Sequence, residues 1–157
     1  MSNGRYFSER DQALVRGLNQ ELLYNIIQTE VVIYRIVPEL TNVNIYGEVD
    51  SKNEKAYYKG VKICAYIDRG PLTTTPDDFI TKSQNTVFKF LYHELKNLNI
   101  YLQEGDLLDF NSRLFQIDNV EGQEQLLGGQ PDNSFSIICN SHYSRLSLND
   151  LNFIDQQ

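Results

Sequence analysis

The sequence predicts an α+β fold that is mainly β: an antiparallel, barrel-like sheet with one N-terminal amphipathic helix and a long functional loop. Three observations predict it. Apolar residues recur at helical spacing early in the chain, over residues 14–27. Segments rich in β-branched and aromatic residues dominate after residue 30. A hairpin pattern over residues 107–120 then indicates antiparallel pairing.

The N-terminal helix is predicted from an apolar stripe in which residues recur every four positions, at Leu14, Leu18, Leu22 and Ile26, flanked by Val15, Leu23 and Ile27. Its start is indicated by Ser8 and Asp11, which resemble a capping box. Gly17 is a tolerated weak point inside it. The stripe could serve a cofactor or a partner, but we expect it to pack on the sheet.

Strands are predicted in order at residues 31–37, 44–49, 56–67, 86–92 and 135–143. Pro38 ends the first of them, and Gly60 is expected to bend or bulge the third. Residues 93–99 favour a short helix, and residues 146–154 favour either a terminal helix or an extended arm.

A core hairpin is predicted within residues 104–120, which combine an acidic turn, a strand, a short loop and a second strand. A loop over residues 111–114 sets Phe110 opposite Phe115 and Leu108 opposite Ile117. All four side chains then share one face, while the polar residues between them face the other side.

Residues 68–85 are predicted to form a long loop, which in a small domain is usually functional. The candidate assembly or channel residues within it are Thr73, Thr74, Thr75, Asp77, Asp78, Phe79 and Ile80. If the loop lines a channel, its two carboxylates repel DNA. If it docks on a neighbouring protein, Phe79 and Ile80 are the natural anchors.

Length and composition favour one domain over residues 1–157, with arms at residues 1–10 and 145–157. A net charge of −7 and a pI near 4.8 disfavour tight DNA binding, which needs clustered lysine and arginine. We find no apolar run of transmembrane length and no secretory signal. The two cysteines are expected to be reduced and buried, in a cytosolic assembly environment.

Neither a catalytic centre nor a metal or cofactor site is predicted, so we do not expect an enzyme. His93 and Glu94 begin a zinc-protease motif, but Asn97 stands where its second histidine is needed. Cys139 and His142 lie three residues apart, and two ligands on one strand do not make a tetrahedral zinc site.

Several short motifs occur in the same order as in one phage family. They are residues 22–38, Tyr46-Gly47-Glu48, Glu104-Gly105-Asp106-Leu107, Phe115-Gln116-Ile117 and Leu127-Gly128. Over roughly residues 20–145, the chain resembles the neck proteins, also termed head-completion or head-closure proteins, of contractile-tailed bacteriophages. It is shorter than the better-known members, and residues 70–85 have no obvious counterpart in them.

The resemblance implies a virion structural protein that forms a ring, typically sixfold, between the DNA-filled head and the tail, and helps to retain or gate the DNA. Implied partners are further copies of the chain, a portal-bound adaptor ring, tail terminator or tail tube proteins, and genomic DNA passing through the lumen without tight binding. No membrane is implied. The implied location is the virion neck, with assembly in the host cytoplasm.

Two alternatives remain open at this point. One is another phage tail part, such as a tail terminator or a baseplate component. The other is a small β-barrel module that binds a carbohydrate or a peptide.

Overall fold

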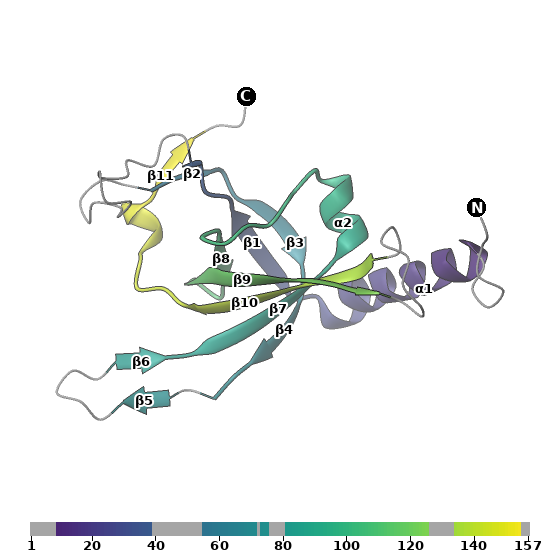
Figure 1. Cartoon of the computed structure of the whole chain (residues 1–157), viewed down its shortest axis with the longest axis horizontal. Helices are drawn as coiled ribbons and strands as arrows, with labels where there is room; N and C mark the ends of the chain where they lie inside the picture. The colour runs from purple at the N-terminus through teal and green to yellow at the C-terminus, as the bar shows by residue number, and fades with distance from the viewer. Residues whose placement is uncertain (1–8, 39–54, 72, 76–80, 126–133, 155–157) are drawn as a thin grey trace.

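The computed structural model describes residues 9–38, 55–71, 73–75, 81–125 and 134–154 (Figure 1). The N-terminal half contains α1 (Glu9–Glu21), the π-helix η1 (Leu22–Ile27), β1 (Glu30–Tyr34), β2 (Ala56–Tyr58), β3 (Val61–Cys64), β4 (Tyr66–Arg69) and β5 (Thr73–Thr75). The C-terminal half contains β6 (Thr81–Ser83), β7 (Asn85–Leu91), α2 (Tyr92–Asn97), β8 (Leu107–Phe110), β9 (Arg113–Gln125), β10 (Ser134–Tyr143), the 3-10 helix η4 (Leu148–Asp150) and β11 (Asn152–Ile154).

The main sheet has seven strands in the order β3-β1-β8-β9-β10-β7-β4, and every neighbouring pair is antiparallel. Its two edge strands, β3 and β4, are separated in the chain by Ala65 alone. One bent segment therefore supplies both edges, which curls the sheet into a half-barrel (Figure 1). The predicted class, mainly β with one N-terminal helix, is confirmed.

The predicted strand over residues 56–67 is divided into three. β2 ends before Gly60, where a side chain would clash with Val32 and Tyr34 of β1. β2 leaves the main sheet and pairs in parallel with β11 near the C-terminus. Part of residues 146–154 is therefore extended, as one of the two predictions for this segment proposed. The strand predicted at residues 44–49 lies outside the described residues.

Much of the segment predicted as a long loop forms paired strands. β5 pairs with β6, in the register Thr73↔Ser83, Thr74↔Lys82 and Thr75↔Thr81. This two-stranded hairpin, which we call the arm, continues β4 and β7 and extends away from the half-barrel at the lower left of Figure 1. Asp77, Asp78, Phe79 and Ile80 lie outside the described residues.

The register predicted for the core hairpin is wrong by two residues. Leu108 pairs with Phe115, and Phe110 pairs with Arg113. The physical reason is the turn: Asn111 and Ser112 both have positive φ, 52° and 59°, as a two-residue I′ turn requires. A shift of two keeps side chains on their faces, so Leu108, Phe110, Phe115 and Ile117 still share one face.

The main core lies inside the curve of the half-barrel. Its buried members are Val31, Ile33, Ile63, Ala65, Phe88, Phe90, Leu95, Ile100, Leu102, Leu108, Phe115, Ile117 and Cys139. The aromatic rings of Phe88 and Phe115 meet edge to face, with centroids 5.5 Å apart. Leu107 and Leu114 are buried on the opposite face, so both faces of the hairpin are covered.

The helix exists, but the prediction that its apolar stripe packs on the sheet is wrong. Leu14, Leu18, Leu22 and Ile26 are 62%, 57%, 44% and 75% exposed. A four-residue spacing advances about 40° per step around an α-helix, so the stripe drifts around the helix from Leu14 to Ile26. The sheet is contacted instead near Leu23, which is buried, and α1 extends beyond the sheet at the right of Figure 1.

Candidate functional site

The structure separates the residues that the sequence singled out. Thr73, Thr74 and Thr75 form β5 in the arm. Leu108, Phe115 and Ile117 are in the core, and Phe110 packs against it. The core hairpin is therefore part of the scaffold, whereas β5, among the predicted residues that the structure describes, belongs to the arm that extends away from the half-barrel (Figure 1).

A second candidate site, which the sequence did not reveal, is an apolar groove of about 210 Å³ between the helices and the sheet. We call it the helix–sheet groove. Its lining comprises Asn19, Leu22, Leu23, Ile27, Tyr66, Lys89, Phe90, Leu91, Phe135 and Ser136. These residues come from α1, η1, β4, β7 and β10, which is why no local pattern in the sequence indicated the groove.

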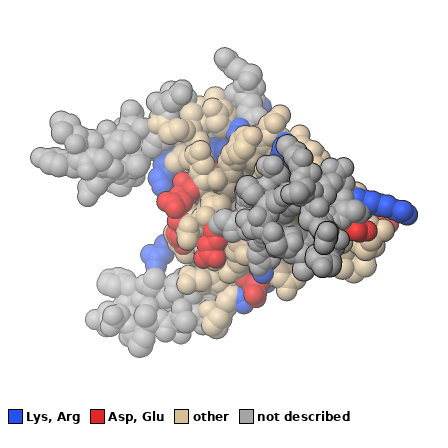
Figure 2. All heavy atoms as spheres, turned by 45° about the vertical axis from the view of Figure 1, so that its right-hand side comes forward, with Lys and Arg blue, Asp and Glu red and all other residues tan. Residues whose placement is uncertain are grey.

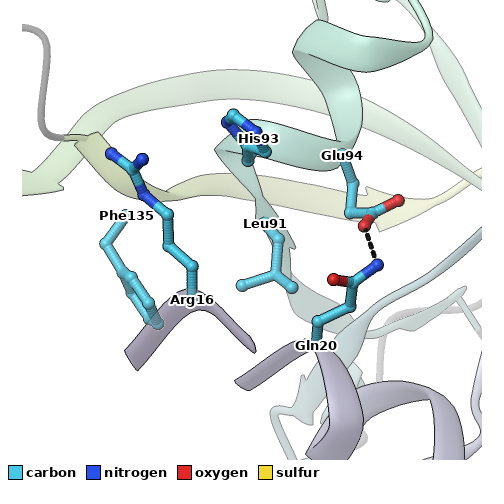
Figure 3. Close-up of a pocket in the computed structure, with 6 residues that line it drawn as sticks. All are labelled: Arg16, Gln20, Leu91, His93, Glu94 and Phe135. Atoms are coloured by element: carbon cyan, nitrogen blue, oxygen red, sulfur yellow. Dashed lines mark hydrogen bonds between the residues drawn. The ribbon is translucent and has the colours of Figure 1, made fainter. Parts of the chain in front are cut away.

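A smaller hollow of about 30 Å³ lies between α1 and α2 (Figure 3). Gln20 extends from α1 and donates a hydrogen bond of 2.7 Å to Glu94 Oε1. The Tyr24 hydroxyl donates to the other oxygen, Glu94 Oε2, at 3.2 Å. Burial and the neighbouring Glu94 carboxylate raise the pKa of Tyr24 to about 12, so this hydroxyl keeps its proton. Glu94 therefore links α1 and η1 to α2 through these two hydrogen bonds.

Replacing Glu94 with alanine should loosen α1 while leaving the half-barrel intact. Both hydrogen bonds are exposed, so the loss in global stability should stay below about 1 kcal/mol. The larger effect should be faster amide hydrogen exchange across residues 10–21, measured by mass spectrometry. Glu94→Gln, which keeps an acceptor oxygen, is the matched control and should exchange nearly as slowly as the wild type. Unchanged protection in Glu94→Ala would contradict this role.

Polar side chains form a second cluster on the exposed surface of β9 and β10. His142 Nδ1 lies 2.6 Å from Asp118 Oδ1, and Asn140 donates a hydrogen bond of 2.5 Å to Glu121 Oε1. Within the described residues, no group of three or more histidine, cysteine or acidic side chains is arranged to hold a metal ion. The cluster therefore stabilises cross-strand pairs on a solvated face.

Among the described residues, the one buried carboxyl group is that of Asp106, from the Glu-Gly-Asp-Leu segment. Its side chain is 1% exposed. Oδ1 accepts a hydrogen bond from the Ile36 amide and Oδ2 accepts one from the Gln103 amide, both at 2.9 Å. Burial raises the pKa of Asp106, although these two bonds and the charge of Arg35 oppose the shift. The carboxyl group thus joins the segment after β1 to the turn before β8, which is a structural role.

The two cysteines are free and buried, in agreement with the sequence-based expectation. Burial raises the pKa of Cys139 to about 12 and also raises that of Cys64. Because the thiolate is the reactive form, neither thiol is activated as a nucleophile.

Charge is mixed rather than concentrated on the face seen in Figure 2. Acidic and basic side chains of the described residues lie interspersed there, without a broad basic area. Such a face lacks the clustered cations with which proteins neutralise phosphate groups.

None of the described helices has the length and apolarity needed to cross a membrane. No protein-family model matches the sequence, and no curated protein shows significant similarity to it.

Proposed function

We propose that this protein is a structural subunit of the neck of a contractile-tailed bacteriophage. In this role, copies of the chain form a ring that joins the DNA-filled head to the tail and helps to retain or gate the DNA. The ring, sixfold by the family resemblance, sits between a portal-bound adaptor ring and tail terminator or tail tube proteins. The protein acts as a virion component after assembly in the host cytoplasm, and it is not an enzyme.

The observation that carries this proposal is the arm. A two-stranded hairpin is only marginally stable in water without a surface to pack on. The arm nevertheless extends beyond the half-barrel, anchored at its base by a 2.9 Å hydrogen bond from the Gly70 amide to the Asn85 carbonyl. A protruding ribbon of this kind suits contact with a neighbouring subunit or projection into a channel.

A closed ring also needs two different surfaces on each subunit, one to contact the preceding copy and one to contact the following copy. The arm and α1 lie at opposite ends of the molecule in Figure 1 and differ in structure. They provide the asymmetry that a heterologous interface requires. The net charge of −7 fits a conduit through which DNA passes without being held.

Replacing residues 72–82 with a short Gly-Ser linker tests the proposal. The Gly70–Asn85 contact remains, so the circular dichroism spectrum and melting temperature of the monomer should change little. Phage particles assembled with this variant should leak DNA or fail to join tails, as seen by electron microscopy and infectivity assays. Thr74→Val, which keeps a β-branched residue in β5, is the control and should support normal particles.

Normal infectious particles from the linker variant would refute a role for the arm. If the protein is instead another phage tail part, antibody labelling of particles should locate it in the tail or baseplate and not in the neck. A carbohydrate or peptide module would remain unassembled and bind its ligand in the helix–sheet groove, and this outcome would overturn the neck assignment.

A further inference from the structure

We propose that the exposed face of α1 is a self-association surface, on which a second copy of the chain docks its own α1 in antiparallel orientation across a two-fold axis. The inference does not rest on the proposed function, since it concerns the free protein: in an assembled ring α1 would contact a different surface of the next copy, so this dimer would dissociate first. It is motivated by an unusual surface of the described residues, a helix whose two leucines are both more than half exposed. Leu14 is 62% and Leu18 57% exposed.

The accessible surface is wider than these two leucines. Ala13 and Gly17, which precede them, are exposed as well, and a Cβ atom placed on Gly17 would meet nothing within 4 Å. A hollow of about 260 Å³ lies over Gly17, lined also by Gln20, Glu21, Tyr24 and Asn25. The helix thus presents two apolar projections beside a recess that a side chain from another molecule can enter.

The order of residue types identifies the occupant as a second copy. Suppose that two α1 helices run antiparallel, with Arg10 of one opposite Glu21 of the other. The numbers of any two facing residues then add up to the same total as 10 and 21. Leu14 then faces Gly17, and Leu18 faces Ala13. Each leucine meets a small residue, so the backbones can approach closely and the leucines pack into the space left beside them.

The charges agree with this register. Arg10 and Glu21 are both exposed and, at about 100° per residue, lie within about 20° of each other around the helix, next to the leucines. A two-fold axis brings residues on this side of one helix to the same side of the other. It therefore creates two identical Arg10–Glu21 pairs, one at each end of the contact. A parallel pairing would place like charges together.

Charge reversal provides a sharp test, using sedimentation equilibrium of the purified full chain. The wild type should show a reversible monomer–dimer equilibrium. Arg10→Glu and Glu21→Arg should each weaken the dimer by about tenfold or more, because each places like charges at both ends. The double variant, which exchanges the two charges, should restore wild-type affinity. Arg145→Glu, an exposed reversal of the same kind after β10, should have no effect.

The register can be tested separately by disulfide trapping. A mixture of Leu14→Cys and Gly17→Cys chains should form a cross-linked heterodimer under mild oxidation, and the native cysteines are buried and should not interfere. Each chain alone should cross-link much less. A wild-type monomer at every accessible concentration, or a dimer indifferent to both charge reversals, would overturn the proposal. Unchanged monomeric circular dichroism spectra would show that the variants remain folded.

Discussion

Truncating Phe115 to alanine should lower the free energy of unfolding by about 3–5 kcal/mol, the range typical of a buried phenylalanine. Phe115 is 3% exposed and contacts two rings, Phe88 at 5.5 Å and Tyr143 at 6.1 Å between centroids. Its removal leaves a cavity in the middle of the half-barrel, between strands that cannot easily close around it. Chemical denaturation monitored by circular dichroism measures the loss.

Phe110→Ala is the internal comparison. Phe110 shares the same face but is only partly buried, and its ring is covered by the Arg69 guanidinium at 4.7 Å. It should therefore cost clearly less than Phe115→Ala. Equal losses at the two positions would contradict the partial burial of Phe110.

The second large effect is expected at Asp106. Asp106→Ala removes the acceptors of the Ile36 and Gln103 amides, and we expect a loss of about 2–4 kcal/mol because hydrogen bonds to a charged group are strong and their donors would be left unpaired. Asp106→Asn keeps one acceptor and should cost less. Tyr57→Phe is the control: the Tyr57 hydroxyl is buried with no hydrogen-bond partner among the described residues, so its removal should be neutral or stabilising.

Asp106 also makes stability depend on pH. Its folded-state pKa is raised above the ordinary value of 3.8, so the folded protein holds the proton more tightly than the unfolded chain. This contribution to stability is fully present below pH 3.8 and is lost as the pH rises through the folded-state pKa. Relative to Asp106→Asn, the wild type should therefore lose stability over that window. A difference that grows with pH would show that the two amides lower the pKa more than burial raises it.

Several features of the fold follow from the sequence alone because they depend on local physics. The β-branched and aromatic residues of β1, β7 and β10 form strands near where they were predicted. The short helix α2 overlaps the predicted helix over residues 93–99 and begins one residue earlier. The side-chain facing of the core hairpin was also predictable, because alternation along a strand survives a shift of two residues.

Other features were decided by contacts between distant parts of the chain. The helical segment contacts the sheet near Leu23 of η1, whereas the four-residue spacing of the stripe gave no sign that Leu14 and Leu18 of α1 remain exposed. Pairing of β5 with β6 converted a segment rich in glycine, proline and threonine into an arm. Neither of these two outcomes has a local energetic signature large enough to read in advance. The hairpin register, by contrast, was set locally, by the positive φ angles of Asn111 and Ser112.

The candidate functional surfaces also divide into those that the sequence indicated and those that only the structure revealed. Composition and motif spacing argued against catalytic and metal-binding chemistry, and the short motifs indicated the neck-protein resemblance. The helix–sheet groove required α1, η1, β4, β7 and β10 to meet, and the exposure of Leu14 and Leu18 required the helix to extend past the sheet. The sequence by itself determined which side chains are available for contact. Only the tertiary structure decided which of them are buried in the core and which remain exposed, because burial depends on which other parts of the chain pack against them.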